Sequence, residues 1–203
     1  MSACRIPLVP SQIELISSRD ELNYQEVLDD FVNAEYIFVT TFNISEKRDE
    51  LLESLRTAAE YAEVRIVTNI PTRYDTYYGQ NPRNKAKKSI DNYTKRLMPG
   101  ELESFSTFFH FNNHTKVVLT NNIAYVGSAN FSDESERSRE TGILIKDPSM
   151  VQLIIDNLVP LIEGEGIQYF GDLANKKQLA FSMYLSRIRT AIDEIQHGLY
   201  FYP

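Results

Sequence analysis

Two apolar segments with a helical stretch between them constrain the fold of this 203-residue chain more than any other feature. Residues 34–44 (AEYIFVTTFNI) and residues 64–70 (VRIVTNI) are rich in β-branched and aromatic side chains, as is typical of strands covered on both faces. Between them, apolar side chains recur at helical spacing, at Leu51, Leu52, Leu55, Ala58 and Ala59. Ser45 is expected to cap this helix. Strand–helix–strand units form parallel sheets with right-handed crossovers.

The remaining pattern adds antiparallel strands and more helices. We expect strands at residues 13–17, 104–112, 114–120, 123–127 and 141–147, and helices at residues 23–33, 84–97 and 148–159. Asn121-Asn122 fits a two-residue hairpin turn, and Asp147 caps the helix that Pro148 opens. Residues 172–200 form a long amphipathic helix. The fold class is therefore α/β, with a mixed β-sheet sandwiched between helices and a C-terminal amphipathic helix.

Composition narrows the functional class. With 42% hydrophobic and 24% charged residues, the chain is ordinary for a globular protein. Its single cysteine, Cys4, excludes an intrachain disulfide and a cysteine metal cluster. There is no secretory signal pattern and no apolar run of membrane-spanning length. We expect a soluble, cytoplasmic protein that makes no membrane contact.

The charge of the chain is unevenly distributed. The formal net charge is −7, which by itself disfavours a nucleic-acid partner. Residues 83–96, however, hold six basic residues against one acidic residue, a local charge of +5. Lys85, Lys87 and Lys88 in this segment, with Tyr77 and Tyr78 in the loop before it, are candidate substrate-binding residues. The alternatives are a solvated helix face for the lysines and a covered core edge for the tyrosines.

The chemistry-bearing residues gather in residues 110–140. In a strand, His114 and Lys116 point to the same side, because residues two apart share a face. The turn 127–130, Gly-Ser-Ala-Asn, offers its backbone N–H groups and the side chains of Ser128 and Asn130 to an anionic oxygen. Glu140 follows on the next strand and is expected to orient the imidazole of His114.

This combination resembles the signature of the phospholipase D superfamily. The matching residues are His-x-Lys at 114–116, Gly-Ser-x-Asn at 127–130 and the downstream Glu-Thr-Gly at 140–142. Asn121 stands where the signature has an acid, but branches such as the tyrosyl-DNA phosphodiesterases are active without that acid. The likeness spans residues 13–160, so we assign residues 1–170 to a phospholipase D-like catalytic domain. Residues 171–203 form a helical extension that packs on this domain or on a dimer partner.

The resemblance implies roles for the site residues. His114 is the nucleophile that forms a covalent phosphohistidine, and Lys116 and Asn130 hold non-bridging oxygens of the phosphate. Ser128 and Glu140 complete the catalytic set. No metal and no cofactor are expected. A second histidine must act as general acid, and the expected source is His114 of a second copy in a homodimer with a shared active site.

Simpler interpretations remain open for single residues. His114 and Lys116 can be an ordinary strand end, and Ser128 and Asn130 can be turn residues only. Glu140 can form a surface salt bridge with Arg137 or Arg139. The spacing of His110 and His114 suggests zinc, but a third ligand is missing, so His110 is expected to pack in or beside its strand.

The leading functional hypothesis is a metal-independent phosphodiesterase, a nuclease that cleaves DNA, or else RNA. Superfamily chains with one motif copy and no signal peptide resemble small bacterial nucleases, whereas the phospholipases carry two copies in longer chains. The first alternative is a phospholipase or another small-phosphodiester hydrolase. The second is a catalytically dead interaction module on the same fold.

Overall fold

The computed structural model describes residues 4–45, 48–70 and 80–201. Its strands are β1 (Cys4–Val9), β2 (Ile13–Ser18), β3 (Tyr36–Thr41), β4 (Glu63–Asn69), β5 (Phe105–His110), β6 (Val117–Thr120), β7 (Ala124–Gly127), β8 (Glu140–Ile145) and β9 (Ile167–Tyr169). Its helices are α1 (Gln25–Asp29), a 3-10 turn η1 (Asp30–Asn33), α2 (Glu50–Ala58), α3 (Gln80–Arg96), α4 (Glu134–Arg137), α5 (Pro148–Asn157), α6 (Val159–Gly164) and α7 (Leu173–Phe201). No helix in the described ranges is both long and apolar enough to span a membrane.

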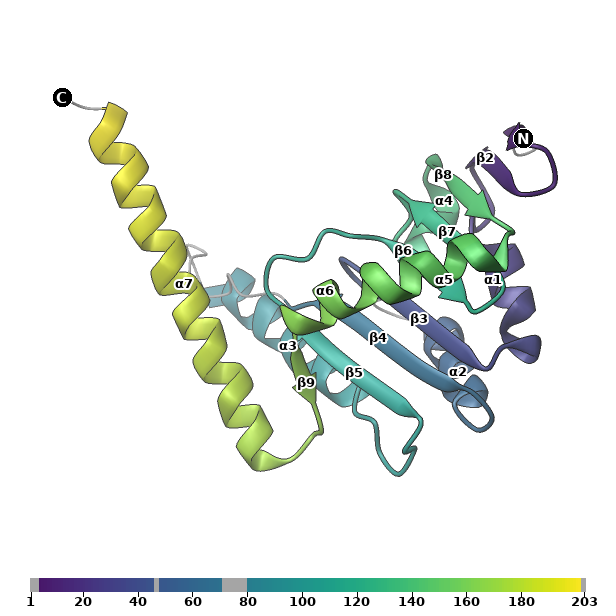
Figure 1. The fold of residues 1–203 in the computed structure, drawn as a ribbon. Coiled ribbons are helices and arrows are strands. Elements are labelled where there is room, and N and C mark those ends of the chain that lie inside the picture. Colours follow the sequence, from purple (N-terminus) through teal and green to yellow (C-terminus); the bar gives the residue numbers. More distant parts are fainter. Residues whose placement is uncertain (1–3, 46–47, 71–79, 202–203) are drawn as a thin grey trace. The chain divides into compact units, whose positions relative to one another are not determined.

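The strands form one mixed sheet in the order β1-β2-β8-β7-β6-β3-β4-β5-β9 (Figure 1). Strands β3, β4 and β5 run parallel, so the predicted strand–helix–strand unit is confirmed. Strand β6 runs antiparallel to β3, with Thr40 opposite Val117. The start of β6 therefore lies at the carboxyl edge of β3, the edge at which ligands bind in open α/β sheets.

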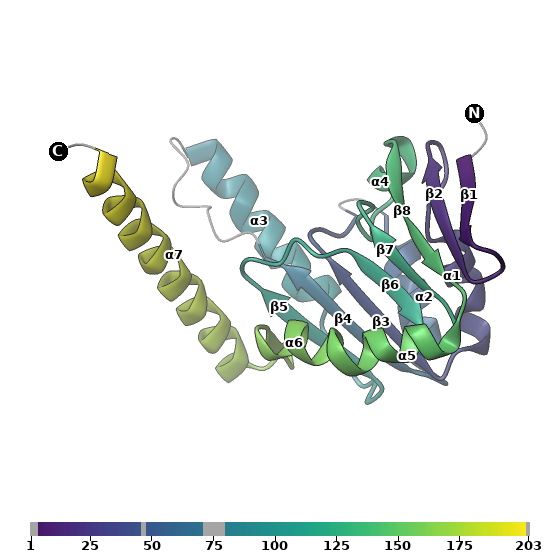
Figure 2. The same cartoon turned by 45° about the horizontal axis from the view of Figure 1, so that its top comes forward.

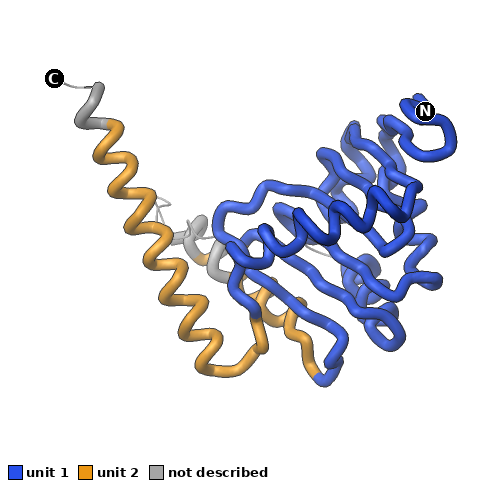
Figure 3. The backbone as a smooth tube through the Cα atoms, viewed as in Figure 1, with its two compact units in different colours: residues 1–69, 101–168 blue, residues 70–100, 169–203 orange. Residues whose placement is uncertain are grey.

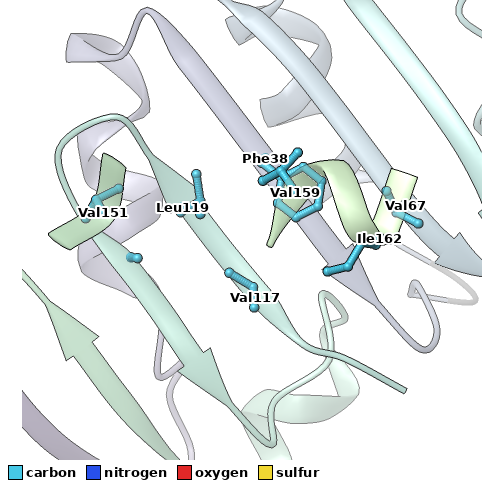
Figure 4. Close-up of a cluster of buried hydrophobic side chains, with 8 residues drawn as sticks. Phe38, Val67, Val117, Leu119, Val151, Val159 and Ile162 are labelled. Carbon is cyan, nitrogen blue, oxygen red and sulfur yellow. The ribbon is translucent and has the colours of Figure 1, made fainter. Parts of the chain in front are cut away.

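Helices cover the central strands on both faces (Figures 1 and 2). Helices α5 and α6 cross one face, where strand and helix side chains form a buried apolar cluster (Figure 4). This cluster consists of Phe38, Val67, Val117, Leu119, Ala124, Val151, Val159 and Ile162. Helices α1 and α2 lie behind the sheet, against the side chains that alternation turns to the other face, such as Ile37 and Val39, both fully buried. The predicted fold class, a mixed sheet between helices, is confirmed.

Individual turn and capping residues explain where several helices and strands begin or end. Asn121 and Asn122 form the predicted two-residue hairpin turn, closed by a bond of 2.9 Å from Thr120 N to the carbonyl oxygen of Ile123. Asp147 caps α5 as predicted, accepting hydrogen bonds from the backbone N–H groups of Ser149 and Met150. The predicted cap Ser45 is wrong, because α2 begins only at Glu50. The Ser45 hydroxyl instead accepts a hydrogen bond from Asp133 N, which ties the segment after β3 to the segment after β7.

The chain divides into two compact units (Figure 3). The first contains residues 1–69 and 101–168, and the second contains residues 70–100 and 169–203. Residues 70–100, which the sequence analysis assigned to the first domain, thus group with α7. The division into a catalytic domain and a C-terminal extension stays a functional prediction.

Candidate active site

The predicted catalytic residues lie together at the edge of the first unit where β3 ends. His114 and Lys116 precede β6, Ser128 and Asn130 follow β7, and Glu140 opens β8. The three strands are neighbours of one another or of β3, since β7 pairs with both β6 and β8. The topology therefore brings residues that are up to 26 positions apart to one edge.

His114 and Lys116 do not belong to a strand, contrary to the sequence prediction, because β6 begins only at Val117. The cause is Asn113, whose Oδ1 accepts a hydrogen bond of 2.9 Å from Thr115 N. A side chain that bonds the backbone two residues on replaces the ladder with a turn. The two site residues still meet, since Lys116 Nζ lies 3.3 Å from His114 Nδ1.

The His114 side chain is exposed and held from two sides. Its ring packs against Phe42, with 5.1 Å between ring centroids. Lys116 contacts Nδ1 of the ring and also donates a hydrogen bond of 2.8 Å to the His114 carbonyl oxygen. The exposed imidazole has the accessibility that a nucleophile requires.

Lys116 is a buried cation, with 8% of its surface exposed. Its ammonium lies 5.7 Å from the centre of the Phe42 ring, within the range of a cation–π contact. Burial lowers the pKa of Lys116, because a poorly solvated site disfavours the charged form, and the negative charge of Glu140 partly opposes this effect. Such a group gives strong electrostatic stabilisation to an anion that reaches it.

The backbone of the turn 127–130 does not form the predicted anion cradle. Each of its four N–H groups already has an acceptor: Gly127 N bonds the Lys116 carbonyl oxygen, Ser128 N the Thr141 carbonyl oxygen, Ala129 N the Tyr125 hydroxyl and Asn130 N the Ser135 hydroxyl. That prediction is wrong, because oxygen atoms of Lys116, Thr141, Tyr125 and Ser135 already accept hydrogen bonds from all four groups. Contacts to a phosphate must come from side chains here.

The Asn130 side chain is placed for such a contact. Its backbone is fixed at both ends, since the carbonyl oxygen accepts a hydrogen bond of 3.0 Å from the buried Tyr24 hydroxyl. Its Oδ1 lies 3.5 Å from the Thr41 hydroxyl. Among the described residues its Nδ2 has no hydrogen-bond partner, so an amide donor is left for a substrate oxygen.

Glu140 holds Ser128 and does not contact His114. The Ser128 hydroxyl donates to Glu140 Oε2 and accepts a hydrogen bond of 3.0 Å from Thr141 N. The predicted orientation of His114 by Glu140 is therefore not seen. Neither is the alternative salt bridge to Arg137 or Arg139 found in the described part of the chain. Glu140 acts on the site through the charge it presents to Lys116.

Three residues that the sequence analysis missed, Asn113, Thr40 and Thr41, join the segment of His114 to the segment that follows β7. Asn113 Nδ2 donates to the Thr40 hydroxyl at 2.8 Å and to the Thr41 carbonyl oxygen at 3.4 Å. The Thr41 hydroxyl accepts Phe131 N at 2.9 Å. The end of β3 thus binds the His114 segment on one side and the turn after β7 on the other. No sequence signal distinguishes Thr40 and Thr41 from other strand threonines, but an asparagine directly before the histidine marks a turn.

Asn121, at the usual position of an acid, has a structural role. Its Oδ1 accepts hydrogen bonds from Glu35 N at 2.9 Å and Tyr36 N at 3.2 Å, at the start of β3. An amide oxygen accepts these bonds as a carboxylate does. This explains why the departure from the signature leaves the hairpin in place.

His110 lies apart from this site. It ends β5, and two strands, β4 and β3, separate β5 from β6. Nδ1 of His110 accepts Asn112 N at 3.0 Å, and Nε2 lies 3.1 Å from Glu165 Oε2. No set of three metal-ligating side chains occurs among the residues that the structure describes.

The predicted substrate-binding residues belong to the second unit. Lys88 is exposed on α3, and Lys85 and Lys87 lie on the same helix. Tyr77 and Tyr78 lie outside the described residues. The role of these five residues stays a prediction.

A known protein family matches the part of the chain that contains this site. The model of a family described as "Cardiolipin synthase, PLD-like domain" matches residues 30–159, well over half of the chain. This range contains all five predicted catalytic residues. A comparison with curated protein sequences gave no significant match.

Two solved structures share the fold. Nuc, a phospholipase D family member from Salmonella typhimurium, superposes with a TM-score of 0.50 at 17% identity, over 77% of this chain and 97% of Nuc. Phosphatidylserine synthase from Haemophilus influenzae superposes with a TM-score of 0.56 at 13% identity, over 88% of this chain. The match covers 47% of the synthase, so the chain spans about half of its length. At these identities the likeness concerns the fold alone.

Proposed function

The chain belongs to the phospholipase D-like domain family, and from this premise we propose that it is a metal-independent nuclease that acts through a phosphohistidine. Family membership supports a phosphodiesterase-type enzyme. The observation that carries the finer proposal is the contact between the exposed His114 ring and the buried Lys116 ammonium, 3.3 Å apart. Asn130 supplies a second donor at the same edge.

The proposed reaction has two displacements at phosphorus. In the first, a ring nitrogen of His114 attacks, the bond to the leaving oxygen breaks, and a second histidine gives that oxygen a proton. In the second, the same histidine removes a proton from water, which attacks phosphorus and breaks the P–N bond. Lys116 and Asn130 hold the non-bridging oxygens, on which negative charge is concentrated throughout.

The second histidine comes, in this proposal, from another copy of the chain. Both ring nitrogens of His110 are engaged, by Asn112 N and by Glu165, and His110 ends β5, which β4 and β3 separate from β6. A two-fold axis through the site places one His114 on each side of a single phosphate, and two-fold symmetry is the commonest form of self-association. The homodimer and its shared site are thus part of the proposed mechanism.

Nucleic acid is the proposed substrate because of α3. Its segment 83–96 carries +5 in a chain of net charge −7, and a polyanion responds to the local potential. DNA is favoured over RNA in this proposal, and the cytoplasmic location expected from the sequence stays a prediction. The description of the matched family favours one alternative, a lipid phosphodiester.

The decisive assay compares substrates and variants without metal. Purified protein in EDTA is incubated with labelled single- and double-stranded DNA, RNA and phosphatidylcholine. We expect cleavage of nucleic acid, its loss in His114→Ala and its retention in His197→Ala, a histidine exposed on α7. Acid-labile label on wild-type protein, absent from His114→Ala, identifies the phosphohistidine.

Each contrary outcome has a distinct meaning. Hydrolysis of phosphatidylcholine alone would establish the lipid alternative. A strict requirement for added magnesium or manganese would exclude the phosphohistidine scheme and favour a two-metal nuclease. Full turnover in His114→Ala would refute the assigned nucleophile, and binding without any cleavage would identify an interaction module.

A further inference from the structure

Helix α7 carries a stripe of exposed apolar side chains that the proposed site does not use. Phe181, Leu185, Ile188, Ile192 and Ile195 are each between 40% and 64% exposed. Successive members are four, three, four and three residues apart, and the sequence continues this spacing to Leu199. Alternating steps of three and four residues are the spacing of the a and d positions of a coiled coil.

The stripe is not the face with which the helix already packs. Between Leu173 and His197, the buried residues of α7 are Asn175, Leu179 and Met183, with 3–8% of their surfaces exposed. At 100° per residue, Met183 points about 160° away from both Phe181 and Leu185. The helix therefore has a second apolar face opposite the buried one.

The residue types on this face disfavour a parallel dimer of α7 helices. Leu185 and Ile192 occupy a positions, and Ile188 and Ile195 occupy d positions. Leucine at a with isoleucine at d is unfavourable in parallel dimers. In an antiparallel pair of two copies, Leu185 lies opposite Ile195 of the second copy and Ile188 opposite its Ile192. Every apolar layer of the stripe is then matched by the same stripe.

The charges on α7 are complementary in the same register. Arg187 and Arg189 precede the centre of the stripe, and Asp193 and Glu194 follow it. In the antiparallel register, Arg189 is at an e position beside the apolar contact, and Asp193 of the second copy lies on the same side, about 3 Å away along the helix axis. In a parallel register, the residue across from Arg189 is the neutral Tyr184 of the second copy.

We propose that α7 is a dimerisation helix that pairs with α7 of a second copy, antiparallel, about an axis level with Thr190. The partner is a second copy of this chain because the stripe is self-complementary in shape and in charge. This inference rests on α7 alone and holds whether or not the proposed nuclease chemistry is correct.

Sedimentation of the full chain tests the seam, the proposed contact between the apolar stripes of two α7 helices. Wild-type protein should be a dimer, and Ile188→Lys with Ile192→Lys should raise the dissociation constant at least about 100-fold, because four ammonium groups would be buried in one seam. The matched control is Thr190→Lys with His197→Lys, which adds the same charge at exposed positions off the stripe. Circular dichroism should show that both variants stay helical.

Cysteine cross-linking tests the orientation. In a Cys4→Ser background, a tagged Ile188→Cys chain is mixed with an untagged Ile192→Cys chain and oxidised. An antiparallel pair gives the mixed disulfide, whereas a parallel pair gives the two homodisulfides. Homodisulfides alone would overturn the orientation, and a monomeric wild-type chain would overturn the proposal. Neither readout depends on activity, so a failed nuclease assay would leave the result unaffected.

Discussion

At the scale of single residues, the site depends on how Lys116 and His114 are placed and solvated. Lys116 is buried beside Phe42 and His114, and the charge of Glu140 acts on its ammonium group. The backbone N–H groups of the turn 127–130 all donate hydrogen bonds to other oxygen atoms of the protein. In the proposed mechanism the Lys116 side chain offers a positive charge to the phosphate, so activity should depend on the protonation of this residue.

The pH dependence of the reaction should reflect the lowered pKa of Lys116. Burial makes the ammonium lose its proton below the ordinary value of 10.5, so activity is present below the shifted pKa and lost as pH rises through it. We expect kcat/KM to decrease at alkaline pH with a midpoint below pH 10.5. Lys116→Arg should move this midpoint upward, since arginine stays protonated, and Lys116→Ala should lower turnover by about 10²–10³. If Lys116→Arg left the midpoint of this decrease unchanged, the decrease would belong to the titration of another group.

Asn113 should act as a positioning residue for His114. Its side chain forms hydrogen bonds with Thr40, Thr41 and Thr115. We expect Asn113→Ala to lower kcat by about 10-fold to 100-fold with little change in KM, because a small displacement of a nucleophile is costly. Asn112→Ala, at the exposed neighbouring position, is the matched control. Equal kinetics for the two variants would show that the Asn113 bonds do not position the nucleophile.

Gly127 is required for packing rather than for phosphate binding. A Cβ at this position would lie 2.3 Å from the Tyr125 hydroxyl and 2.7 Å from the Gly142 backbone. We expect Gly127→Ala to lower the free energy of unfolding by about 1–3 kcal/mol, as overpacking does. Gly164→Ala, where a Cβ has open space, is the control. Denaturant unfolding measures both, and equal stability would show that the turn adapts to the methyl group.

At the scale of elements, the sequence predicted the fold better than the details of the site. Periodicity located the central strands because their side chains are buried on both faces. It missed β1, whose six residues are all exposed and therefore show no burial pattern. It also placed His114 in a strand, since the bond from Thr115 N to Asn113 is an effect of one side chain on the backbone that no periodicity reports. The engaged donors of the turn 127–130 depend on Tyr125 and Ser135, which approach only in the folded chain.

Helix α3 should supply affinity for nucleic acid rather than chemistry. We expect Lys87→Glu with Lys88→Glu to weaken binding and to flatten its salt dependence, because fewer counterions are released from the polyanion. Fluorescence anisotropy at several salt concentrations measures both quantities. Lys176→Glu with Lys177→Glu, a pair of exposed lysines on α7, makes the same charge change elsewhere in the chain. An unaltered salt slope in the α3 variant would mean that the lysines form only a solvated helix face.

At the scale of the whole molecule, two independent proposals involve a second copy. The proposed chemistry requires two histidines on opposite sides of one phosphate, and one chain offers only His110, His114 and His197. The stripe on α7 is an apolar face that matches itself. The two arguments concern different units of the chain, so each can fail without the other. A dimer built through α7 alone would carry two separate sites, whereas a shared site makes the two copies interdependent.

Mixing experiments distinguish these cases. Wild-type chains are combined with a growing excess of His114→Ala chains under conditions that allow subunit exchange. In a shared site, a mixed dimer lacks one of its two histidines, so activity should fall with the square of the wild-type fraction. Separate sites would give activity proportional to that fraction, as would a fully active monomer. The control replaces His114→Ala with the triple variant Ile188→Lys, Ile192→Lys and His114→Ala. If α7 holds the dimer together, this chain cannot pair with the wild type, and the inhibition should disappear. Inhibition that persists would mean that the shared site itself joins the two copies without α7.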